Sequence, residues 1–323
     1  MMPEPLLSVE GLSVAFSTEQ GRVRVVEDLS FQLAAGETLG LVGESGCGKS
    51  VTAQTIMRLL PSPPSHIEAG RIMFEGEDLA AAPASRMRKI RGDRIGMVFQ
   101  EPMTSLNPTQ RTGLQVAEVL RLHRGMDSRE AKGLAISVLQ KVGIGNAERR
   151  FDQYPHELSG GLRQRVMIAM AIVCGPKLLI ADEPTTALDV TIQAQIIELL
   201  KAVQKDLGLS ILLITHDLGV VAEMCRSVVI MYAGRVVELG STTETFQYPR
   251  HPYTAGLISS SPRSARKGER LRTIPGLVPP PGMRSKGCSF ADRCPRVLEK
   301  CRSEFPPLAP LSGRLAACWN PVP

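Results

Sequence analysis

The sequence predicts an α/β fold in which buried strands alternate with helices. Three short apolar runs read as buried strands: Leu178 to Ala181, Ser210 to Ile214, and Val228 to Tyr232. The stretch from Ile192 to Leu207, between the first two runs, has the length and periodicity of a helix. Strands that alternate with helices in this way favour a parallel sheet covered by helices.

A separate antiparallel sheet is expected near the N-terminus. Apolar and polar side chains alternate there in short runs, at residues 7–9, 12–16, 22–26 and 29–33. This alternation is typical of half-buried strands, and turns are expected at Gly21 and at Ala35-Gly36.

The next segment predicts a buried strand, a glycine-rich loop and a helix in succession. Thr38 to Val42 is a continuous apolar run that leads into the glycines. From Lys49 the pattern is helical as far as Leu60, and the prolines that follow end the helix.

The rest of the chain divides into a helical stretch and a proline-rich C-terminal segment. Residues 102–175 read as mostly helical, with breaks at 143–145 and 154–156. From about Pro249, prolines and glycines become frequent and helical periodicity fades. We therefore expect a main domain over residues 1–240, with a helical subdomain at about 101–175, and a C-terminal extension over 241–323.

Composition limits the class of protein. The chain has 323 residues, 43% of them apolar, a net charge of +6 and a pI near 9.0, as for a globular protein with a large core. The mild positive charge fits an anionic ligand, an anionic membrane surface or simply an ordinary surface. No run of like charges indicates nucleic-acid binding. No stretch reaches about 18 apolar residues, so we expect a soluble or peripheral protein, with any membrane spanned by another chain.

The glycine-rich loop has the spacing G-x-x-x-x-G-K-S that binds nucleotide phosphates. Glycines let backbone N–H groups wrap the phosphates, and the helix that follows directs its positive end at them. Lys49 is expected to reach the β- and γ-phosphates, and Ser50 to hold Mg²⁺. The predicted ATP-binding residues of this segment are Gly43, Glu44, Ser45, Gly46, Cys47, Gly48, Lys49, Ser50 and Val51.

Two carboxylates end the strand predicted at residues 178–181. Asp182 is expected to bind Mg²⁺, and Glu183 to act as the general base that polarises the attacking water. Paired acids at a strand end can also be a solvated edge, but beside a phosphate loop the catalytic interpretation is favoured.

Further motifs resemble those of the ATP-binding cassette (ABC) ATPases. Leu158 to Arg165 resembles their signature sequence, in which Ser159, Gly160 and Gly161 would contact the ATP of a partner chain. The resemblance also implies roles for Gln100 in the Q-loop, which would contact Mg²⁺, for His216 as the switch histidine, and for Asp189 in the loop that crosses to the partner. Early aromatics stack on adenine in this family, which makes Phe16 the candidate here; a core position is the alternative.

One signature position departs from the common pattern. Leu162 stands where the superfamily often has Gln, although peptide-importer subunits commonly carry an apolar residue there. The departure leaves open how well this half-site supports hydrolysis.

Longer segments resemble the ATP-binding subunits of dipeptide and oligopeptide importers, most of all the D-type ATPase of dipeptide permeases. These segments are Gln100 to Pro108, Arg165 to Leu200, and His251 to Thr254. The resemblance implies a second ATPase subunit, two transmembrane permeases, an extracytoplasmic substrate-binding protein and a place on the cytoplasmic face of the inner membrane. A nickel or other small-solute importer ATPase, and a soluble ABC ATPase without a transport role, remain the alternatives.

Four of the seven cysteines cluster near the C-terminus: Cys288, Cys294, Cys301 and Cys318. No leader sequence is evident, so we expect a reducing compartment and no disulfides. Their spacing lacks the C-x₂₋₄-C knuckle of common zinc sites and differs from ferredoxin runs, so by itself it leaves zinc, an iron–sulfur cluster or free thiols open. Related peptide-importer ATPases carry a cluster in a similar arrangement, and this resemblance implies a [4Fe–4S] cluster.

Overall fold

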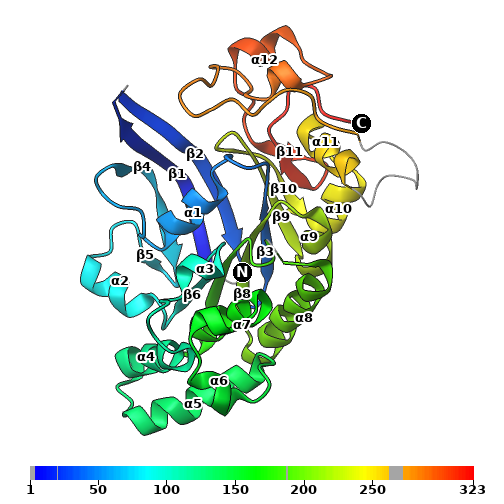
Figure 1. Ribbon diagram of the computed structural model, residues 1–323. Coiled ribbons are helices and arrows are strands. Elements are labelled where there is room, and N and C mark those ends of the chain that lie inside the picture. Colours follow the sequence, from blue (N-terminus) through cyan, green and yellow to red (C-terminus); the bar gives the residue numbers. More distant parts are fainter. Residues whose placement is uncertain (1–3, 20, 187, 262–271) are drawn as a thin grey trace. The chain divides into compact units, whose positions relative to one another are not determined.

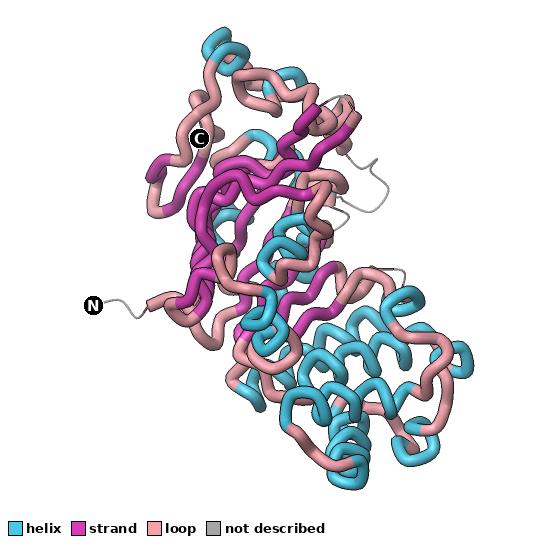
Figure 2. Tube along the Cα trace, turned by 90° about the vertical axis from the view of Figure 1, so that its left-hand side faces the viewer, coloured by secondary structure: helices cyan, strands magenta, loops and turns pink. Residues whose placement is uncertain are grey.

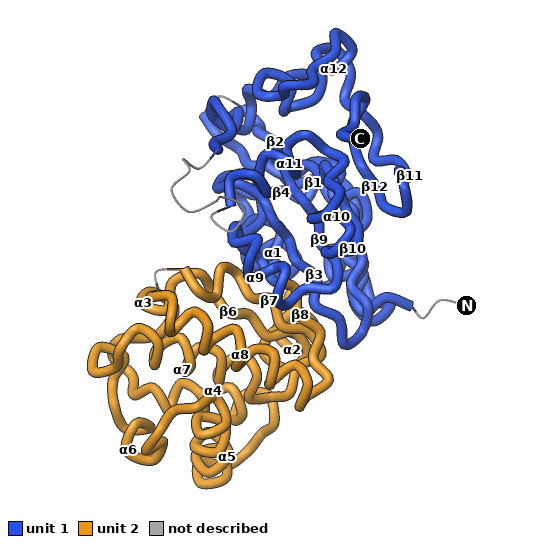
Figure 3. Tube along the Cα trace, turned by 90° about the vertical axis from the view of Figure 1, so that its right-hand side faces the viewer, with its two compact units in different colours: residues 1–82, 213–323 blue, residues 83–212 orange. Residues whose placement is uncertain are grey.

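The computed structural model describes residues 4–19, 21–186, 188–261 and 272–323. They form two compact units (Figure 3). Unit 1 takes its residues from 1–82 and 213–323, and unit 2 covers 83–212. The predicted division at residue 240 stays a prediction.

Unit 1 contains the expected antiparallel sheet near the N-terminus. Its strands are β1 (Leu7–Thr18), β2 (Gly21–Leu33), β4 (Ser65–Phe74) and β5 (Glu77–Asp78), in the order β2-β1-β4-β5. The four short strands predicted from the alternation are therefore two long ones. Gly11, at a φ of 58°, lies at a register shift between Val9 and Leu12, which allows β1 to continue through an irregular point.

Unit 1 also contains five neighbouring strands of the second sheet, in the order β11-β12-β10-β9-β3. Its strands are β3 (Thr38–Val42), β9 (Ser227–Tyr232), β10 (Arg235–Ser241), β11 (Ala309–Leu311) and β12 (Arg314–Ala316). Strand β3 pairs with β9 in parallel, as the alternation of strands and helices predicts. Strand β12 pairs antiparallel to β10 and β11 pairs antiparallel to β12, so the C-terminal extension completes this edge of the sheet.

The helices of unit 1 are short. They are α1 (Lys49–Ile56), α9 (Leu218–Met224), α10 (Thr242–Gln247), α11 (Pro252–Ser260) and α12 (Glu299–Ser303), with a 3₁₀ turn at Ala291–Arg293 (Figure 1). Helix α1 ends four residues before the predicted Leu60. Arg58 adopts a φ of 50° and donates to the carbonyl oxygen of Leu79, and this turn ends the helix ahead of the prolines.

The C-terminal extension packs onto β9 through an aromatic cluster. The rings of Tyr232, Tyr253 and Phe290 lie edge to face, with centroids 4.6 to 5.4 Å apart. All three side chains are buried, and edge-to-face pairs of this kind contribute about 0.5–1.5 kcal/mol each beyond area burial. Close packing thus joins residues from β9, from α11 and from the N-cap of the 3₁₀ turn at Ala291–Arg293.

Unit 2 is the helical part of the chain, with two parallel strands. Strand β6 (Ile95–Val98) pairs with β7 (Leu178–Asp182), and β8 (Ser210–Thr215) begins in this unit and ends in unit 1. The helices are α2 (Ala84–Ile90), α3 (Pro102–Ser105), α4 (Thr112–Arg124), α5 (Ser128–Lys141), α6 (Ala147–Phe151), α7 (Gly160–Ile172) and α8 (Val190–Leu207), with a 3₁₀ turn at Pro155–Glu157. Residues 102–175 are mostly helical, as predicted, and Figure 2 shows helices gathered together in one part of the structure. That residues 101–175 form a subdomain of their own stays a prediction.

Local sequence explains where these helices begin. Asp127 caps α5 by accepting bonds from the N–H groups of Arg129 and Glu130, and Glu130 returns a bond to its N–H. Helix α7 packs against β6, where Gly96 is required: a Cβ there would lie 2.1 Å from the carbonyl oxygen of Ala171.

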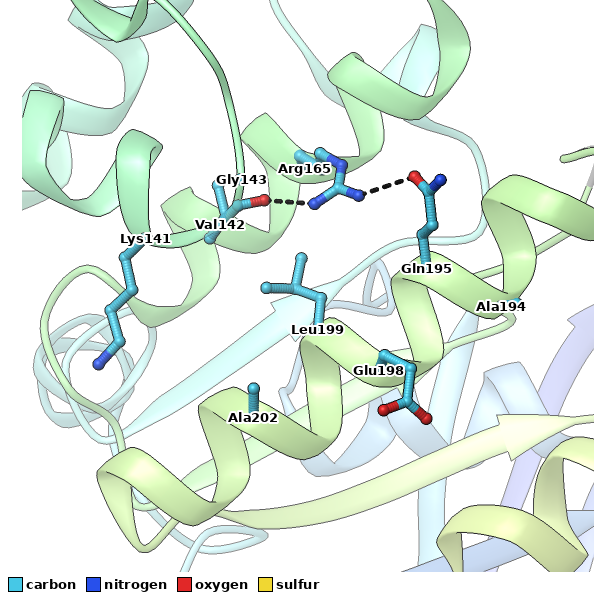
Figure 4. A pocket seen from close by; sticks show the side chains of 9 residues that line it. All are labelled: Lys141, Val142, Gly143, Arg165, Ala194, Gln195, Glu198, Leu199 and Ala202. Carbon is cyan, nitrogen blue, oxygen red and sulfur yellow. Dashed lines mark hydrogen bonds between the residues drawn. The ribbon is translucent and has the colours of Figure 1, made fainter.

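A shallow groove of 460 Å³ lies between the end of α5 and helices α7 and α8 (Figure 4). Arg165 crosses it, donating to the carbonyl oxygen of Val142 at 2.6 Å and to Oε1 of Gln195 at 3.1 Å. Arg165 thereby links three helical segments of unit 2. None of the described helices is long and apolar enough to cross a membrane.

Candidate functional site

The predicted phosphate loop connects β3 to α1 in a tightly packed turn. Gly46 and Gly48 have φ angles of 79° and 102°, which side-chain-bearing residues rarely adopt. Gly43 is fixed by crowding, because an added Cβ would lie 2.3 Å from the carbonyl oxygen of Met231. These three glycines leave the loop backbone bare and strongly curved, which is the cradle that phosphate binding requires.

Lys49 is buried at the end of this loop, with 4% of its surface exposed. Its Nζ donates to the carbonyl oxygens of Gly43 at 2.7 Å and Glu44 at 3.1 Å. The ammonium is therefore held on the loop by backbone groups that an incoming phosphate could replace. Cys47 beside it is buried, and burial raises the pKa of its thiol despite the nearby positive charge of Lys49.

Other predicted nucleotide residues of unit 1 lie on its strands and helices. Ser50 and Val51 lie in the first turn of α1, and Phe16 lies on β1 with a half-exposed side chain. His216 directly follows β8 and is exposed, and Asp217 after it caps α9 by accepting from the N–H of Gly219 at 2.7 Å. The proposed contacts of these residues with ATP stay predictions.

The paired carboxylates lie at the end of β7 in unit 2. Asp182 is the last residue of the strand and has 2% of its surface exposed. Glu183 follows with a φ of 47°, a left-handed conformation that costs a non-glycine residue about 1–3 kcal/mol. Such strain persists where the surrounding structure enforces it, and it turns Glu183 sharply away from the strand direction.

Two side chains hold the Glu183 carboxylate. Gln100, two residues after β6, donates from Nε2 to Oε2 at 3.1 Å, and the Thr186 hydroxyl donates to the same oxygen at 2.7 Å. The structure thus brings together the predicted Q-loop glutamine and the predicted base. The hydrogen bond from Thr186 to this carboxylate was not predicted from the sequence, although it spans only three residues and threonine hydroxyls in turns often bond locally.

The signature residues lie at the start of α7. Ser159 caps the helix by accepting from the N–H of Leu162 at 3.4 Å, and Gly160 is exposed. A Cβ on Gly161 would lie 2.9 Å from Cγ2 of Ile192, so glycine lets α7 approach α8 closely. Asp189 caps α8 by accepting from the N–H of Ile192 at 2.9 Å. Ala187, in the same motif, lies outside the described residues.

The C-terminal extension contacts the phosphate loop, which sequence reasoning missed. Arg293 forms a bidentate ion pair with Glu44: Nη1 lies 2.7 Å from Oε2, and Nη2 lies 3.2 Å from Oε1. Tyr253 accepts from the N–H of Glu44 at 2.9 Å through its hydroxyl oxygen. Only the His-Pro-Tyr motif at 251–253 offered a signal, and it did not indicate what Tyr253 contacts.

The four C-terminal cysteines lie within electrostatic reach of one another. Burial above all, together with the nearby thiols of Cys301, Cys318 and Cys294, raises the pKa of Cys288 to about 11. Burial likewise raises the pKa of Cys318 to about 11. Within residues 4–19, 21–186, 188–261 and 272–323, however, no three Cys, His, Asp or Glu side chains are arranged to hold a metal ion. The side chains as they stand do not form the ligand set of the predicted cluster.

Comparison with known proteins gives matches over the whole chain. A family model described as ABC transporter matches residues 26–186, and one described as oligopeptide/dipeptide transporter, C-terminal region, matches residues 237–301. A protein of Brucella abortus (strain 2308) named as a peptide import ATP-binding protein is 52% identical, over 100% of this chain and 99% of that protein. A protein of Sinorhizobium fredii named as a probable peptide ABC transporter ATP-binding protein is 49% identical, over 98% of this chain and 95% of that protein.

Solved structures of ATP-binding cassette proteins have a similar fold. A dimeric ATP-binding cassette in a post-hydrolysis state, bound to ADP and Pi, matches with a TM-score of 0.66 and 26% identity over 73% of this chain and 98% of that one. A subunit of the cbiONQ ABC transporter complex of Clostridium perfringens matches with a TM-score of 0.64 and 30% identity, over 76% of this chain and 92% of that one.

Proposed function

Because the chain belongs to the ATP-binding proteins of the ABC transporter family, we propose that it hydrolyses ATP to drive the import of dipeptides and oligopeptides. The observation that carries the ATPase function is the Glu183 carboxylate held by Gln100 and Thr186, in a chain that also has a complete phosphate loop. The match of residues 237–301 to the peptide-transporter C-terminal model supports the cargo.

The proposed roles follow the chemistry of phosphoryl transfer, which needs positioning and charge neutralisation above all. The curved loop from Gly43 to Gly48 would receive the phosphates, and Lys49 would exchange its carbonyl partners for phosphate oxygens. Mg²⁺, when bound, neutralises charge on the phosphates, and Ser50, Gln100 and Asp182 are the residues proposed to hold it. Phe16 would stack on adenine.

Glu183 is proposed as the general base. Two hydrogen bonds to Oε2 fix the orientation of the carboxylate, so it can accept a proton from a water aimed at the γ-phosphate. His216 would contribute a further polar contact near the transferred phosphate. These assignments are supported by the hydrogen bonds and by the order of the motifs along the chain.

A pair of ATPase subunits is proposed as the working form. The exposed start of α7, with Ser159 and Gly160, is suited to contact a nucleotide held by another subunit. The solved cassette to which this chain is similar is itself described as dimeric. We further propose two membrane-spanning permeases and an extracytoplasmic binding protein as partners, with this chain peripheral on the cytoplasmic face of the inner membrane.

A [4Fe–4S] cluster on Cys288, Cys294, Cys301 and Cys318 is the finer proposal for the C-terminal segment. The mutual electrostatic influence of the thiols supports it, although their present arrangement does not form a ligand set, and no catalytic step is assigned to it. Anaerobically purified chain is expected to carry about four iron atoms, as four thiolates suit such a cluster. Zinc alone, or no metal at all, would overturn this proposal.

Uptake measurements test the function as a whole. Cells that lack their other peptide importers are given labelled dipeptides and longer peptides, with wild-type chain or with Glu183→Gln. Loss of peptide uptake in the variant is expected. If neither strain takes up any peptide, peptide cargo is excluded, and uptake of nickel and other small solutes is measured next. Equal peptide uptake by both strains would instead count against Glu183 as the base. An ATPase that fractionates away from the membrane even with permeases present would indicate a role outside transport.

A further inference from the structure

We propose that Arg293 of the C-terminal extension is a positioning residue for the phosphate loop, and that it sets the affinity for ATP by neutralising Glu44. The inference rests on the proposed function, since it assumes that this loop binds ATP. It goes further by giving the C-terminal segment, which lies far from the loop in sequence, a direct part in nucleotide binding.

The ion pair between these residues is geometrically specific. The two terminal nitrogens of Arg293 each contact one carboxylate oxygen of Glu44, Nη1 with Oε2 at 2.7 Å and Nη2 with Oε1 at 3.2 Å. The Arg293 side chain is 7% exposed and that of Glu44 is 26% exposed. A bidentate pair of this burial is stronger and more directional than a surface salt bridge.

The guanidinium of Arg293 is itself held in place by its own segment. Its Nε donates to the carbonyl oxygen of Pro275 at 2.9 Å, and Nη2 donates to that of Ile274 at 3.2 Å. Its Nη1 also donates to the Tyr232 hydroxyl at 3.2 Å. Because these contacts use several donors at once, they hold the guanidinium in position independently of Glu44.

Glu44 is held at three points as a result. Its N–H donates to the Tyr253 hydroxyl, its carbonyl oxygen accepts from Lys49, and its carboxylate pairs with Arg293. Two of these three partners, Tyr253 and Arg293, belong to the last 80 or so residues of the chain. The backbone of the second loop residue is therefore positioned from the C-terminal segment.

Charge explains why this position needs an arginine. Glu44 places a carboxylate in a loop whose proposed ligand is a polyphosphate, and like charges repel strongly at short range in a partly buried site. A paired arginine neutralises the carboxylate charge, which removes that repulsion, and it holds the carboxylate against its own guanidinium. Without Arg293, the charge of Glu44 would stay in the loop uncompensated and oppose the nucleotide.

The test is a double-mutant cycle on the full-length chain, with the Kd for Mg²⁺ and a non-hydrolysable ATP analogue as the readout. Arg293→Gln is expected to raise this Kd about tenfold. This is the effect expected when one partner of a charge pair is removed and the other stays partly buried without its counter-charge. Glu44→Gln removes the charge that Arg293 neutralises. In the Glu44→Gln background, Arg293→Gln is therefore expected to change the Kd by less than about twofold.

The cycle separates neutralisation from a merely structural role. If Arg293→Gln weakens binding equally in both backgrounds, or not at all in wild type, the proposal is wrong. Arg302→Gln is the matched control, because Arg302 pairs with Asp292 in the same segment but is 53% exposed; its Kd should equal that of wild type. If the wild-type chain binds no nucleotide, the proposed ATPase function is wrong. This result differs from those that contradict the role of Arg293, so the experiment distinguishes the two.

Discussion

The side-chain amide of Gln100 donates to Oε2 of Glu183 across 3.1 Å, joining the residue that follows β6 to the one that follows β7. Strands β6 and β7 are parallel neighbours, so their carboxyl ends present these two side chains at the same edge. A bond between them links the position of the Gln100 loop to the orientation of the Glu183 carboxylate, which Thr186 also holds. If Glu183 is the base as proposed, a contact that moves this loop is expected to change the rate of hydrolysis.

Replacing Glu183 by Gln should abolish hydrolysis while leaving binding intact. The amide keeps the size of the side chain but cannot accept a proton, and loss of a general base lowers rates by about 10²–10⁴-fold. Phosphate release by the assembled transporter measures the loss, and nucleotide binding serves as the second readout. Glu198→Gln, on the exposed side of α8, is the control that should turn over normally. Normal turnover of the Glu183 variant would rule it out as the base.

Thr186→Val should lower hydrolysis about tenfold, because a hydrogen bond to a charged group contributes about 1.5–3 kcal/mol. Valine has the shape of threonine but cannot donate to Oε2 of Glu183, so the carboxylate loses this hydrogen bond and keeps the one from Gln100. The measurement is kcat for ATP with KM unchanged. A change confined to KM would show that Thr186 contacts nucleotide rather than orienting the base.

Gly161→Ala tests whether the signature acts on a partner's nucleotide. The added Cβ would meet Ile192 at 2.9 Å and push the start of α7 away from α8. Hydrolysis by the assembled pair should fall by about 10²-fold, as for loss of one donor aimed at developing charge. Nucleotide affinity of this chain measured alone should not change. If the variant chain, measured alone, bound nucleotide correspondingly less tightly, the signature residues would act on the nucleotide of their own subunit and not on the partner's.

The buried His251 predicts a pH dependence of stability. Burial lowers its pKa to about 3, and its Nδ1 accepts from the N–H of Tyr253 at 3.1 Å, which requires the neutral ring. The unfolded chain binds a proton near pH 6.5 and the folded chain does not, so stability is full above pH 6.5 and falls as the pH drops towards 3. The expected slope is about 1.4 kcal/mol for each pH unit in that window.

His251→Asn removes this titration while keeping a capping acceptor for α11. Urea unfolding at several pH values between 4.5 and 7.5 should therefore give a shallower pH dependence for the variant. His156→Asn changes an exposed ring and should retain the wild-type slope. If His251→Asn retained it too, the pH dependence would come from other groups.

The elements with strong local signals could be predicted from the sequence. Strand β3 spans the predicted Thr38 to Val42, and α8 differs from the predicted helix only by starting two residues earlier, after the cap at Asp189. Turn glycines and continuous apolar runs fix the first and last residues of such segments to within a few positions. Strands β4 and β5 were not predicted, because the apolar positions of Ser65–Phe74 follow no regular alternation and the strand is held by its pairing with β1.

Contacts between distant residues are what the sequence could not supply. The order of motifs indicates Gln100 and Glu183 as neighbours through resemblance, and a hydrogen bond joins them. Nothing near Arg293 or Glu44 marks them as a pair, since 249 positions separate them and each has several oppositely charged residues closer in sequence. Tertiary packing alone selects that pair.

The late position of Arg293 also has a consequence for protein synthesis. A chain made from its N-terminus has its phosphate loop long before residues 253 and 293 emerge from the ribosome. During that interval Glu44 has neither its arginine nor the Tyr253 hydroxyl, so the nascent loop carries an uncompensated negative charge. If Arg293 neutralises Glu44 as proposed, C-terminally truncated chains are expected to bind ATP less tightly than the full chain.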